Sequence, residues 1–204
     1  MARPRKISDE RLLEATTVVV GRVGPGYTLA QVAEEAGVAP ATLVQRFGSK
    51  HGLQQALSRS VSAVVIDRLR SAAASADDPL DALRVALLTW YDWADSPTEA
   101  GNHIAALGVD LVDPDLRDLL ADHFVAVEGE LAALVRRATA AGELPAAPGV
   151  PVATRILTAL VHGTILNWSV RARGSLRNRL RRDLDVILDA WRRKSTMDTG
   201  EEDR

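Results

Sequence analysis

The chain has 204 residues, 47% of them hydrophobic and 25% charged, a composition typical of a globular protein rather than a disordered one. It contains no cysteine, which excludes disulfides, thiolate metal sites and cysteine nucleophiles. The net charge of −2 argues against a general polyanion binder, although seven Lys/Arg against five Asp/Glu leave residues 1–50 with a charge of +2.

The N-terminal segment is basic but has no apolar run behind it. Arg3, Arg5 and Lys6 are followed by Ile7-Ser8-Asp9-Glu10. A secretion signal needs an apolar stretch at that point, so we expect a cytoplasmic protein. The longest apolar run, residues 156–168, is too short to span a bilayer, and no membrane association is expected. The basic arm fits two interpretations equally: it enters the minor groove of DNA, or it is a solvent-exposed tail.

Apolar residues recur at three- and four-residue spacing along most of the chain, which is the period of an amphipathic α-helix. We find no convincing alternation of the kind that marks a β-strand. Segments rich in Gly and Pro divide the pattern into three short helices before residue 48 and about six longer ones after it. The predicted fold is therefore all-α with about nine helices. It comprises a small domain over residues 1–50, a helical body over 51–196 and a disordered tail over 197–204.

Two of the short helices are joined by a tight turn. Thr28 is placed to cap the first helix with its hydroxyl, because Gln31 follows three residues later as in a capping box. Gly37 tolerates the positive φ that ends this helix, and Val38 fills the gap between the two helices. The pattern predicts a helix, a turn and a second helix.

The second helix carries the side chains that could meet a partner. Pro40 lies in its first turn, and Leu43 and Phe47 face inward. The outward side chains are those of Ala39, Ala41, Thr42, Gln45 and Arg46. Small residues at the leading end would let the helix enter a DNA major groove, where Gln45 and Arg46 could reach base edges or phosphates. The alternative is an ordinary helical hairpin within a bundle.

The next helix is predicted to begin at Lys50, directly after Gly48-Ser49. A side-chain cation beside free N–H groups at a helix end can hold a phosphate, which favours DNA as the partner of this segment.

Residues 7–60 resemble the TetR/AcrR family of bacterial transcriptional regulators. In that family a helix led by Thr or Ser and ending Ile-Ala-x-x-Ala-Gly-Val precedes a recognition helix ending Thr-Leu-Tyr-x-His-Phe and then a Ser-Lys pair. Here Val32-Ala33-Glu34-Glu35-Ala36-Gly37-Val38 matches the first half. The second half is matched by Thr42-Leu43, Phe47, Ser49-Lys50 and Leu53.

The resemblance implies a ligand-responsive regulator with a helix-turn-helix DNA-binding domain over 1–50 and a ligand-binding and dimerisation domain over 51–196. Such a protein binds a palindromic operator as a homodimer and is released by a small-molecule effector. A repressor is favoured, although activators of the same build exist, and no cofactor is expected. The implied DNA-contacting residues are Thr28, Ala39, Pro40, Ala41, Thr42, Gln45, Arg46 and Lys50.

Two positions depart from the family pattern. The tyrosine position holds Val44, which cannot donate a hydrogen bond to a phosphate, and the histidine position holds Arg46, which can. We hypothesise that Arg46 partly replaces the lost phosphate anchor. Val44 and the near-neutral net charge also keep open a second class of function, a helical small-molecule-binding or scaffolding protein without specific DNA binding.

The helix over 152–170 is apolar nearly all round, and Gly163 permits close approach of another helix. The resemblance implies that it pairs, together with the last helix over 176–191, with the same helices of a second subunit; a monomer core is the alternative. The expected dimer-interface residues are Ile156, Leu160, Gly163, Leu180, Leu184 and Ile187.

The effector site is expected among residues, most of them aromatic, on segments that the family uses to line its cavity. Aromatic side chains with a polar edge suit an apolar ligand that carries one or two polar groups. Plain core packing is the alternative for each of them. The expected ligand-binding residues are Trp90, Trp93, His103, Phe124, Val127 and Trp168.

Neither catalysis nor metal binding is expected. The four histidines share no metal-ligand spacing, and no phosphate-binding glycine motif is present. Asp110, Asp113 and Asp115 resemble a calcium loop only superficially, because no Gly or terminal Glu follows at loop spacing. The Asp113-Pro114 pair is better explained as the start of a helix.

Overall fold

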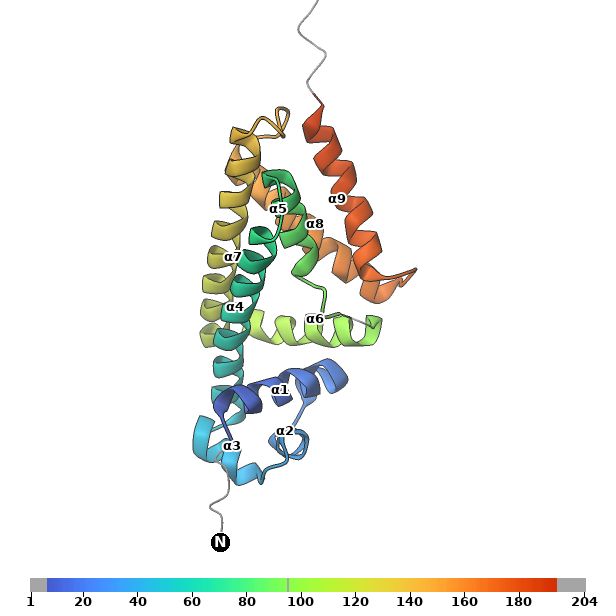
Figure 1. Cartoon of the computed structure of the whole chain (residues 1–204). Coiled ribbons are helices and arrows are strands. Elements are labelled where there is room, and N and C mark those ends of the chain that lie inside the picture. The colour runs from blue at the N-terminus through green and yellow to red at the C-terminus, as the bar shows by residue number, and fades with distance from the viewer. Residues whose placement is uncertain (1–6, 95, 194–204) are drawn as a thin grey trace, which may run out of the picture. The chain divides into compact units, whose positions relative to one another are not determined.

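The computed structural model describes residues 7–94 and 96–193, and in these residues every regular element is helical. The elements are α1 (Asp9–Val23), the short 3-10 helix η1 (Gly24–Gly26), α2 (Leu29–Ala36), α3 (Pro40–Phe47), α4 (Lys50–Ala74), α5 (Pro79–Thr89), α6 (Pro97–Val112), α7 (Pro114–Ala140), α8 (Val150–Val170) and α9 (Leu176–Arg192) (Figure 1). The prediction of an all-α chain with about nine helices is confirmed. The predictions for the basic arm at Arg3, Arg5 and Lys6 and for the tail over 197–204 lie outside the described residues.

The helices form two compact units that do not follow chain order. One contains the described residues up to Ile66 together with 93–126 and 166–172. The other contains 67–92, 127–165 and the described residues from Arg173 onward. Three long helices, α4, α7 and α8, contribute residues to both units. The domain boundary predicted at residue 50 therefore stays a prediction.

Short capping signals fix where several helices begin. Helices α1, α6 and α9 follow Ser8, Ser96 and Ser175, whose hydroxyl oxygens each accept a hydrogen bond from the backbone N–H three residues on. Helix α7 begins at the predicted Asp-Pro pair, where Oδ1 of Asp113 accepts the N–H of Leu116 at 3.1 Å. The interpretation of that pair as a helix start is confirmed.

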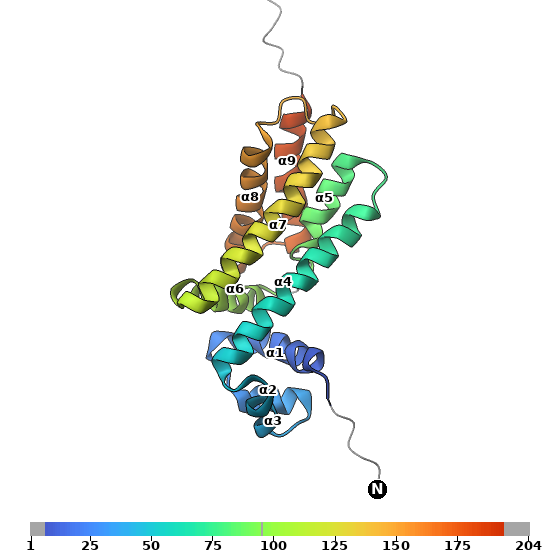
Figure 2. The same ribbon diagram turned by 90° about the vertical axis from the view of Figure 1, so that its left-hand side faces the viewer.

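The core of the first unit is shared by α1, α2, α3 and the start of α4. Its buried apolar residues are Leu12, Ala15, Val19, Val20, Tyr27, Val32, Ala33, Leu43 and Leu53. Helix α6 packs against α1 (Figure 2), where Ala106 contacts this core. The side-chain amide of Asn102 donates to the carbonyl of Gly21 at 2.8 Å. The three short helices are thus held on one core, with α6 supporting α1.

The core of the second unit lies among α5, α7, α8 and α9. Its fully buried leucines include Leu83, Leu87, Leu131, Leu157, Leu184 and Leu188. The hydroxyl of Thr164 on α8 donates to Asp183 on α9 at 2.9 Å, and Nε of Arg84 on α5 lies 3.2 Å from the carboxylate of Asp185. Polar as well as apolar contacts therefore join α9 to α5 and α8.

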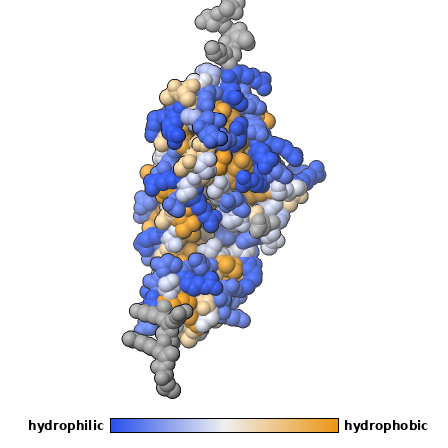
Figure 3. All heavy atoms as spheres, in the orientation of Figure 1, coloured by the Kyte–Doolittle hydropathy of each residue, from blue (hydrophilic) through white to orange (hydrophobic). Residues whose placement is uncertain are grey.

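Several apolar side chains remain at the surface. On α4, Leu53 and Leu69 are buried, whereas Val61 and Val64, which lie between them in sequence, are 40% and 47% exposed. Figure 3 shows apolar side chains that reach the surface in several places among hydrophilic ones. None of the helices in the described part of the chain is long and apolar enough to cross a membrane.

Candidate nucleic-acid interface

The turn between α2 and α3 has the geometry that its residues predict. Oγ1 of Thr28 accepts the N–H of Gln31 at 3.2 Å, and Oε1 of Gln31 accepts the N–H of Thr28 at 2.8 Å, so the predicted capping box is confirmed. Gly37 has a φ of 68°, in the left-handed region. The N–H groups of Gly37 and Val38 both bond back to carbonyls of α2, at 3.1 and 2.9 Å. Helix α2 therefore ends abruptly and the chain turns into α3.

Helix α3 is anchored by one buried side chain and exposes small residues at its leading end. Leu43 is fully buried in the core of the first unit, and Phe47 packs against that core. The N-cap residue is Ala39, and no side chain among the described residues caps this end of the helix. Thr28 is exposed and Thr42 half-buried, and the exposed residues of α3 and its N-cap include Ala39, Pro40, Ala41, Val44 and Gln45. The arrangement leaves room for close approach by a partner.

Arg46 is folded back onto α1. Its guanidinium forms an ion pair with Asp9, and Nη2 donates to the carbonyl of Ile7 at 3.0 Å. The Arg46 side chain is only 22% exposed. We expected it to point outward, and the carboxylate in the first turn of α1 is the physical reason for the difference. Since a guanidinium has five N–H donors, those left over could still reach a phosphate beside this pair.

Lys50 is tied to the turn between α1 and α2. Its Nζ donates to the carbonyl of Pro25 at 2.7 Å and lies 4.3 Å from the centroid of the Tyr27 ring. Tyr27 is buried, and this burial, with the Asp110 carboxylate adding to it, raises the pKa of its hydroxyl to about 12. Burial also lowers the pKa of Lys50. The ammonium therefore has a structural role, and an ammonium has three N–H donors, of which one bonds to Pro25.

The residues at the start of α4 constrain the position of α3. The sequence analysis did not predict this contact. Oγ of Ser49 accepts the N–H of Gly52 at 3.0 Å and so caps α4. A Cβ added at Gly52 would lie 2.1 Å from the carbonyl oxygen of Phe47, the last residue of α3. The only signal in the sequence is a second glycine, four residues after Gly48, inside a predicted first helical turn.

The residues expected to bind a ligand are divided between the two units. Trp90 and Val127 belong to the second unit, and both are buried. The centroid of the Trp90 ring lies 5.8 Å from that of Tyr91 and 4.9 Å from that of His162. The first unit contains Trp93, His103, Phe124 and Trp168. Within it the rings of Trp93 and His103 meet edge to face at 4.3 Å, and burial lowers the pKa of His103. Their role in ligand binding stays a prediction.

The residues expected at a dimer interface differ in accessibility. Leu180 and Leu184 are 2% and 0% exposed within the chain itself, so a partner could not reach them. The other four are half-buried or exposed: Ile156, Leu160, Gly163 and Ile187. An interface at this surface would therefore depend on α8 more than on the buried face of α9.

Comparison with known proteins identifies the helix-turn-helix segment. Residues 12–57 match the family model described as bacterial regulatory proteins, tetR family. A solved protein from Rhodococcus sp., described as a TetR-family transcriptional regulator, is 26% identical, with a TM-score of 0.68 over 88% of this chain and 98% of that chain. A TetR transcriptional regulator from Streptomyces coelicolor is 25% identical, with a TM-score of 0.63 over 91% of this chain and 98% of that chain.

Other comparisons concern the fold alone or give no match. The transcriptional regulator FadR from Bacillus subtilis, solved in complex with stearoyl-CoA, is 17% identical, with a TM-score of 0.70 over 89% of this chain and 97% of that chain. No curated protein gives a significant sequence match. The family model covers nearly all of α1, all of α2 and α3, and the start of α4. This match and the whole-chain likeness to TetR regulators of known structure support a TetR-family transcriptional regulator.

Proposed function

We propose that the chain is a ligand-responsive repressor that binds a palindromic operator as a homodimer and leaves it when a small molecule binds its body. The observation that carries this proposal is the exposed face of α3. Leu43 holds the helix in the core, and the opposite face presents small residues and the exposed side chain of Gln45. A helix of this kind can enter a major groove without steric obstruction.

The chemistry of the candidate residues supports a role for each of those named below. The Gln45 amide can bond to the N6 and N7 positions of an adenine, while Ala39 and Ala41 allow the backbone of α3 to approach the bases. Thr28, Thr42, Arg46 and Lys50 are proposed to contact phosphates, which fix the position of the protein on the duplex. Two copies of α3 would then occupy successive major grooves, roughly 34–36 Å apart.

An exposed apolar stripe on α8 supports a homodimer. Val152, Ile156 and Leu166 are 38%, 37% and 50% exposed and lie along α8, and apolar side chains gathered into one exposed patch mark an interaction surface. They belong to a stripe on α8 whose members are separated by alternating intervals of four and three residues, the period of two helices packed along their length. The complete stripe is Val152, Ile156, Ala159, Gly163, Leu166 and Val170. Pairing with the same stripe of a second copy would make an isologous interface.

The effector is proposed to act by population shift. A ligand that binds more tightly to a dimer whose recognition helices no longer match the groove spacing favours that dimer and lowers operator affinity. The Bacillus subtilis FadR bound to stearoyl-CoA is a protein of the same fold that accommodates a ligand. We propose no catalytic role for this chain and place its action in the cytoplasm.

The proposal is tested by selecting operator sequences from a pool of random double-stranded DNA with the full chain. The expected result is a palindrome bound with an affinity that falls steeply with salt. Gln45→Ala should weaken binding by about 5- to 150-fold, the equivalent of about 1–3 kcal/mol for a bidentate base contact. Gln54→Ala, which removes an amide from α4, is the matched control and should leave the affinity unchanged. Binding to no sequence would favour the alternative of a helical small-molecule-binding or scaffolding protein.

The salt dependence tests the role of Arg46 separately. If the guanidinium contacts a phosphate in the complex, Arg46→Ala should reduce the slope of log affinity against log salt by about one unit. An unchanged slope would restrict Arg46 to its observed ion pair with Asp9.

A further inference from the structure

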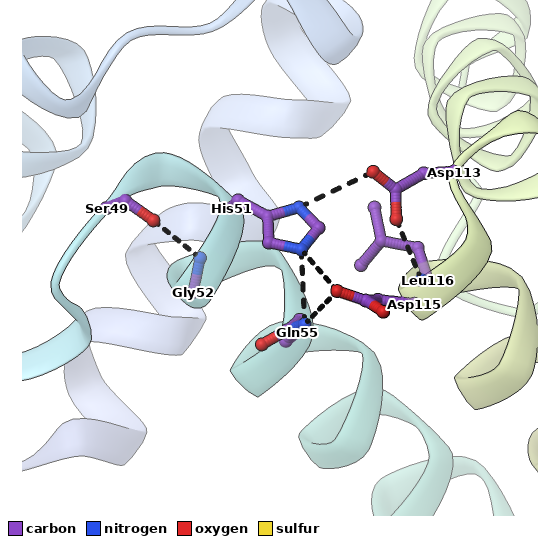
Figure 4. A network of polar contacts seen from close by, with 7 residues as sticks. All are labelled: Ser49, His51, Gly52, Gln55, Asp113, Asp115 and Leu116. Carbon is purple, nitrogen blue, oxygen red and sulfur yellow. Dashed lines mark hydrogen bonds and ion pairs between the residues drawn. The ribbon is translucent and has the colours of Figure 1, made fainter.

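Four polar side chains from the starts of α4 and α7 meet within the first unit (Figure 4). His51 and Gln55 lie on adjacent turns of α4, four residues apart, and therefore on one face of that helix. Asp113 and Asp115 lie at the start of α7, about 60 residues further along the chain. Figure 4 shows the imidazole of His51 between the two carboxylates, with Gln55 beside Asp115.

Three of these groups lie at the mutual separations of metal ligands. Nε2 of His51 lies 3.3 Å from Oδ2 of Asp115, and the Gln55 amide nitrogen lies 3.1 Å from the first and 3.4 Å from the second. Ligand atoms about 2.1 Å from one cation are roughly 3.0 Å apart in an octahedron and roughly 3.4 Å apart in a tetrahedron. A rotation of the Gln55 side-chain amide by 180° exchanges its oxygen and nitrogen. The amide oxygen then occupies the position of the nitrogen and supplies the third ligand atom.

Asp113 lies on the side of the imidazole opposite Asp115, slightly beyond hydrogen-bonding distance. Its Oδ2 lies 3.7 Å from Nδ1 of His51, and its Oδ1 accepts the N–H of Leu116 at 3.1 Å. The carboxylate is therefore fixed by the start of α7 while it faces the ring nitrogen away from Asp115. A carboxylate on the second ring nitrogen is the arrangement that selects the tautomer and raises the basicity of metal-binding histidines.

We propose that Nε2 of His51, a carboxylate oxygen of Asp115 and the amide oxygen of Gln55 bind a divalent first-row transition-metal ion. The side chains of His51 and Asp115 are 41% and 71% exposed, so water can complete the coordination shell. The imidazole ligand favours Zn²⁺, and the two oxygen ligands also suit Mn²⁺, whereas Mg²⁺ and Ca²⁺ prefer oxygen alone. The bound ion would link the first turn of α4 to the first turn of α7.

The same geometry could instead hold a protonated imidazole between two carboxylates, and the test must separate these two states. Titration calorimetry of the full chain, freed of metal with a chelator, with ZnCl₂ and with MnCl₂ should show one saturable site per chain for at least one of these ions. His51→Ala and Asp115→Asn should abolish it, and Asp113→Asn should weaken it by about 10- to 100-fold. Asp118→Asn, an exposed carboxylate one turn further along α7, is the matched control and should bind as the unmodified chain does.

Long-range ¹H–¹⁵N correlation spectra of the imidazole give a second measurement that does not depend on the variants. The metal-bound state predicts a neutral ring that carries its proton on Nδ1, facing Asp113, with Nε2 shifted by the ion. A ring that stays protonated on both nitrogens when Zn²⁺ or Mn²⁺ is added, together with no saturable heat, would overturn the proposal. Equal metal affinity in the unmodified chain, His51→Ala and Asp115→Asn would overturn it as well.

Discussion

Replacing Gly52 by alanine tests whether the start of α4 determines the position of α3. In a helix interior alanine is normally more stable than glycine by about 0.5–1 kcal/mol. Here the added Cβ would lie 2.1 Å from the carbonyl oxygen of Phe47 and 3.3 Å from its carbonyl carbon. That oxygen already accepts the N–H of Ser49 at 2.9 Å. An ordinary contact would require the backbone between α3 and α4 to move by roughly 1 Å or more.

We expect the strain to exceed the gain in helix propensity. Overpacking of this kind costs about 1–3 kcal/mol in the free energy of unfolding, and each kcal/mol lowers the Tm of a chain of this size by roughly 2–4 °C. Thermal unfolding followed by circular dichroism measures the difference. Gly129→Ala on α7 is the matched control, because an added Cβ there meets no heavy atom of the described residues within 4 Å beyond the adjacent backbone of its own helix, and its Tm should stay the same or rise. If Gly52→Ala melted as high as Gly129→Ala, the reasoning would be refuted.

Three further changes probe other parts of the chain. Asp9→Asn should lower the free energy of unfolding by at most about 1 kcal/mol, because the Asp9 side chain is 52% exposed. Urea unfolding should show a smaller loss of stability at high salt, since salt screens the pair with Arg46. A loss that does not depend on salt would mean that this pair does not cause it. Burial and a neighbouring carboxylate raise the pKa of Asp110 to about 6, so the folded state holds this proton more tightly than the unfolded chain. The free energy of unfolding should fall by about 1 kcal/mol, after allowance for solvent screening, as the pH rises from about 4 through 6. Asp110→Asn should remove this part of the pH dependence. Identical pH profiles of stability for Asp110→Asn and the unmodified chain would contradict the prediction. Ile156→Asp should dissociate the proposed dimer, as measured by sedimentation velocity. Val112→Asp, at a position 78% exposed on α6, is the control and should leave the dimer intact. If both variants sedimented as the same species, the result would count against the α8 interface.

Local signals made the helix-turn-helix segment and the start of α7 predictable from sequence. The capping box needs only Thr28 and Gln31, three residues apart, and the end of α2 needs only a residue that tolerates positive φ, which Gly37 supplies. The start of α7 needs only Asp113 beside a proline. In each case the interacting groups lie within one turn of helix, so their separation in sequence fixes their separation in space.

Contacts between distant parts of the chain could not be predicted in this way. Arg46 pairs with Asp9 across 37 residues, and His51 meets Asp115 across 64. Helical periodicity shows which face of a helix is apolar but not what covers that face. For this reason Leu180 and Ile156 were expected together at a dimer interface, although the first is buried in the chain and the second is exposed.

The first turn of α4 brings the two proposals together, because consecutive residues there contact different elements of one unit. Lys50 bonds to the turn after α1, His51 faces the start of α7, and Gly52 lies against the end of α3. An ion bound at His51 would therefore restrict the same turn that positions α3. Given both the operator binding and the metal site proposed above, saturating Zn²⁺ or Mn²⁺ should change operator affinity, and the operator should change metal affinity by the same factor. Fluorescence anisotropy with the selected operator and metal titration of the protein–DNA complex measure the two factors. If the chain binds the ion but has the same operator affinity with and without it, the metal-site proposal stands and the proposed coupling is refuted.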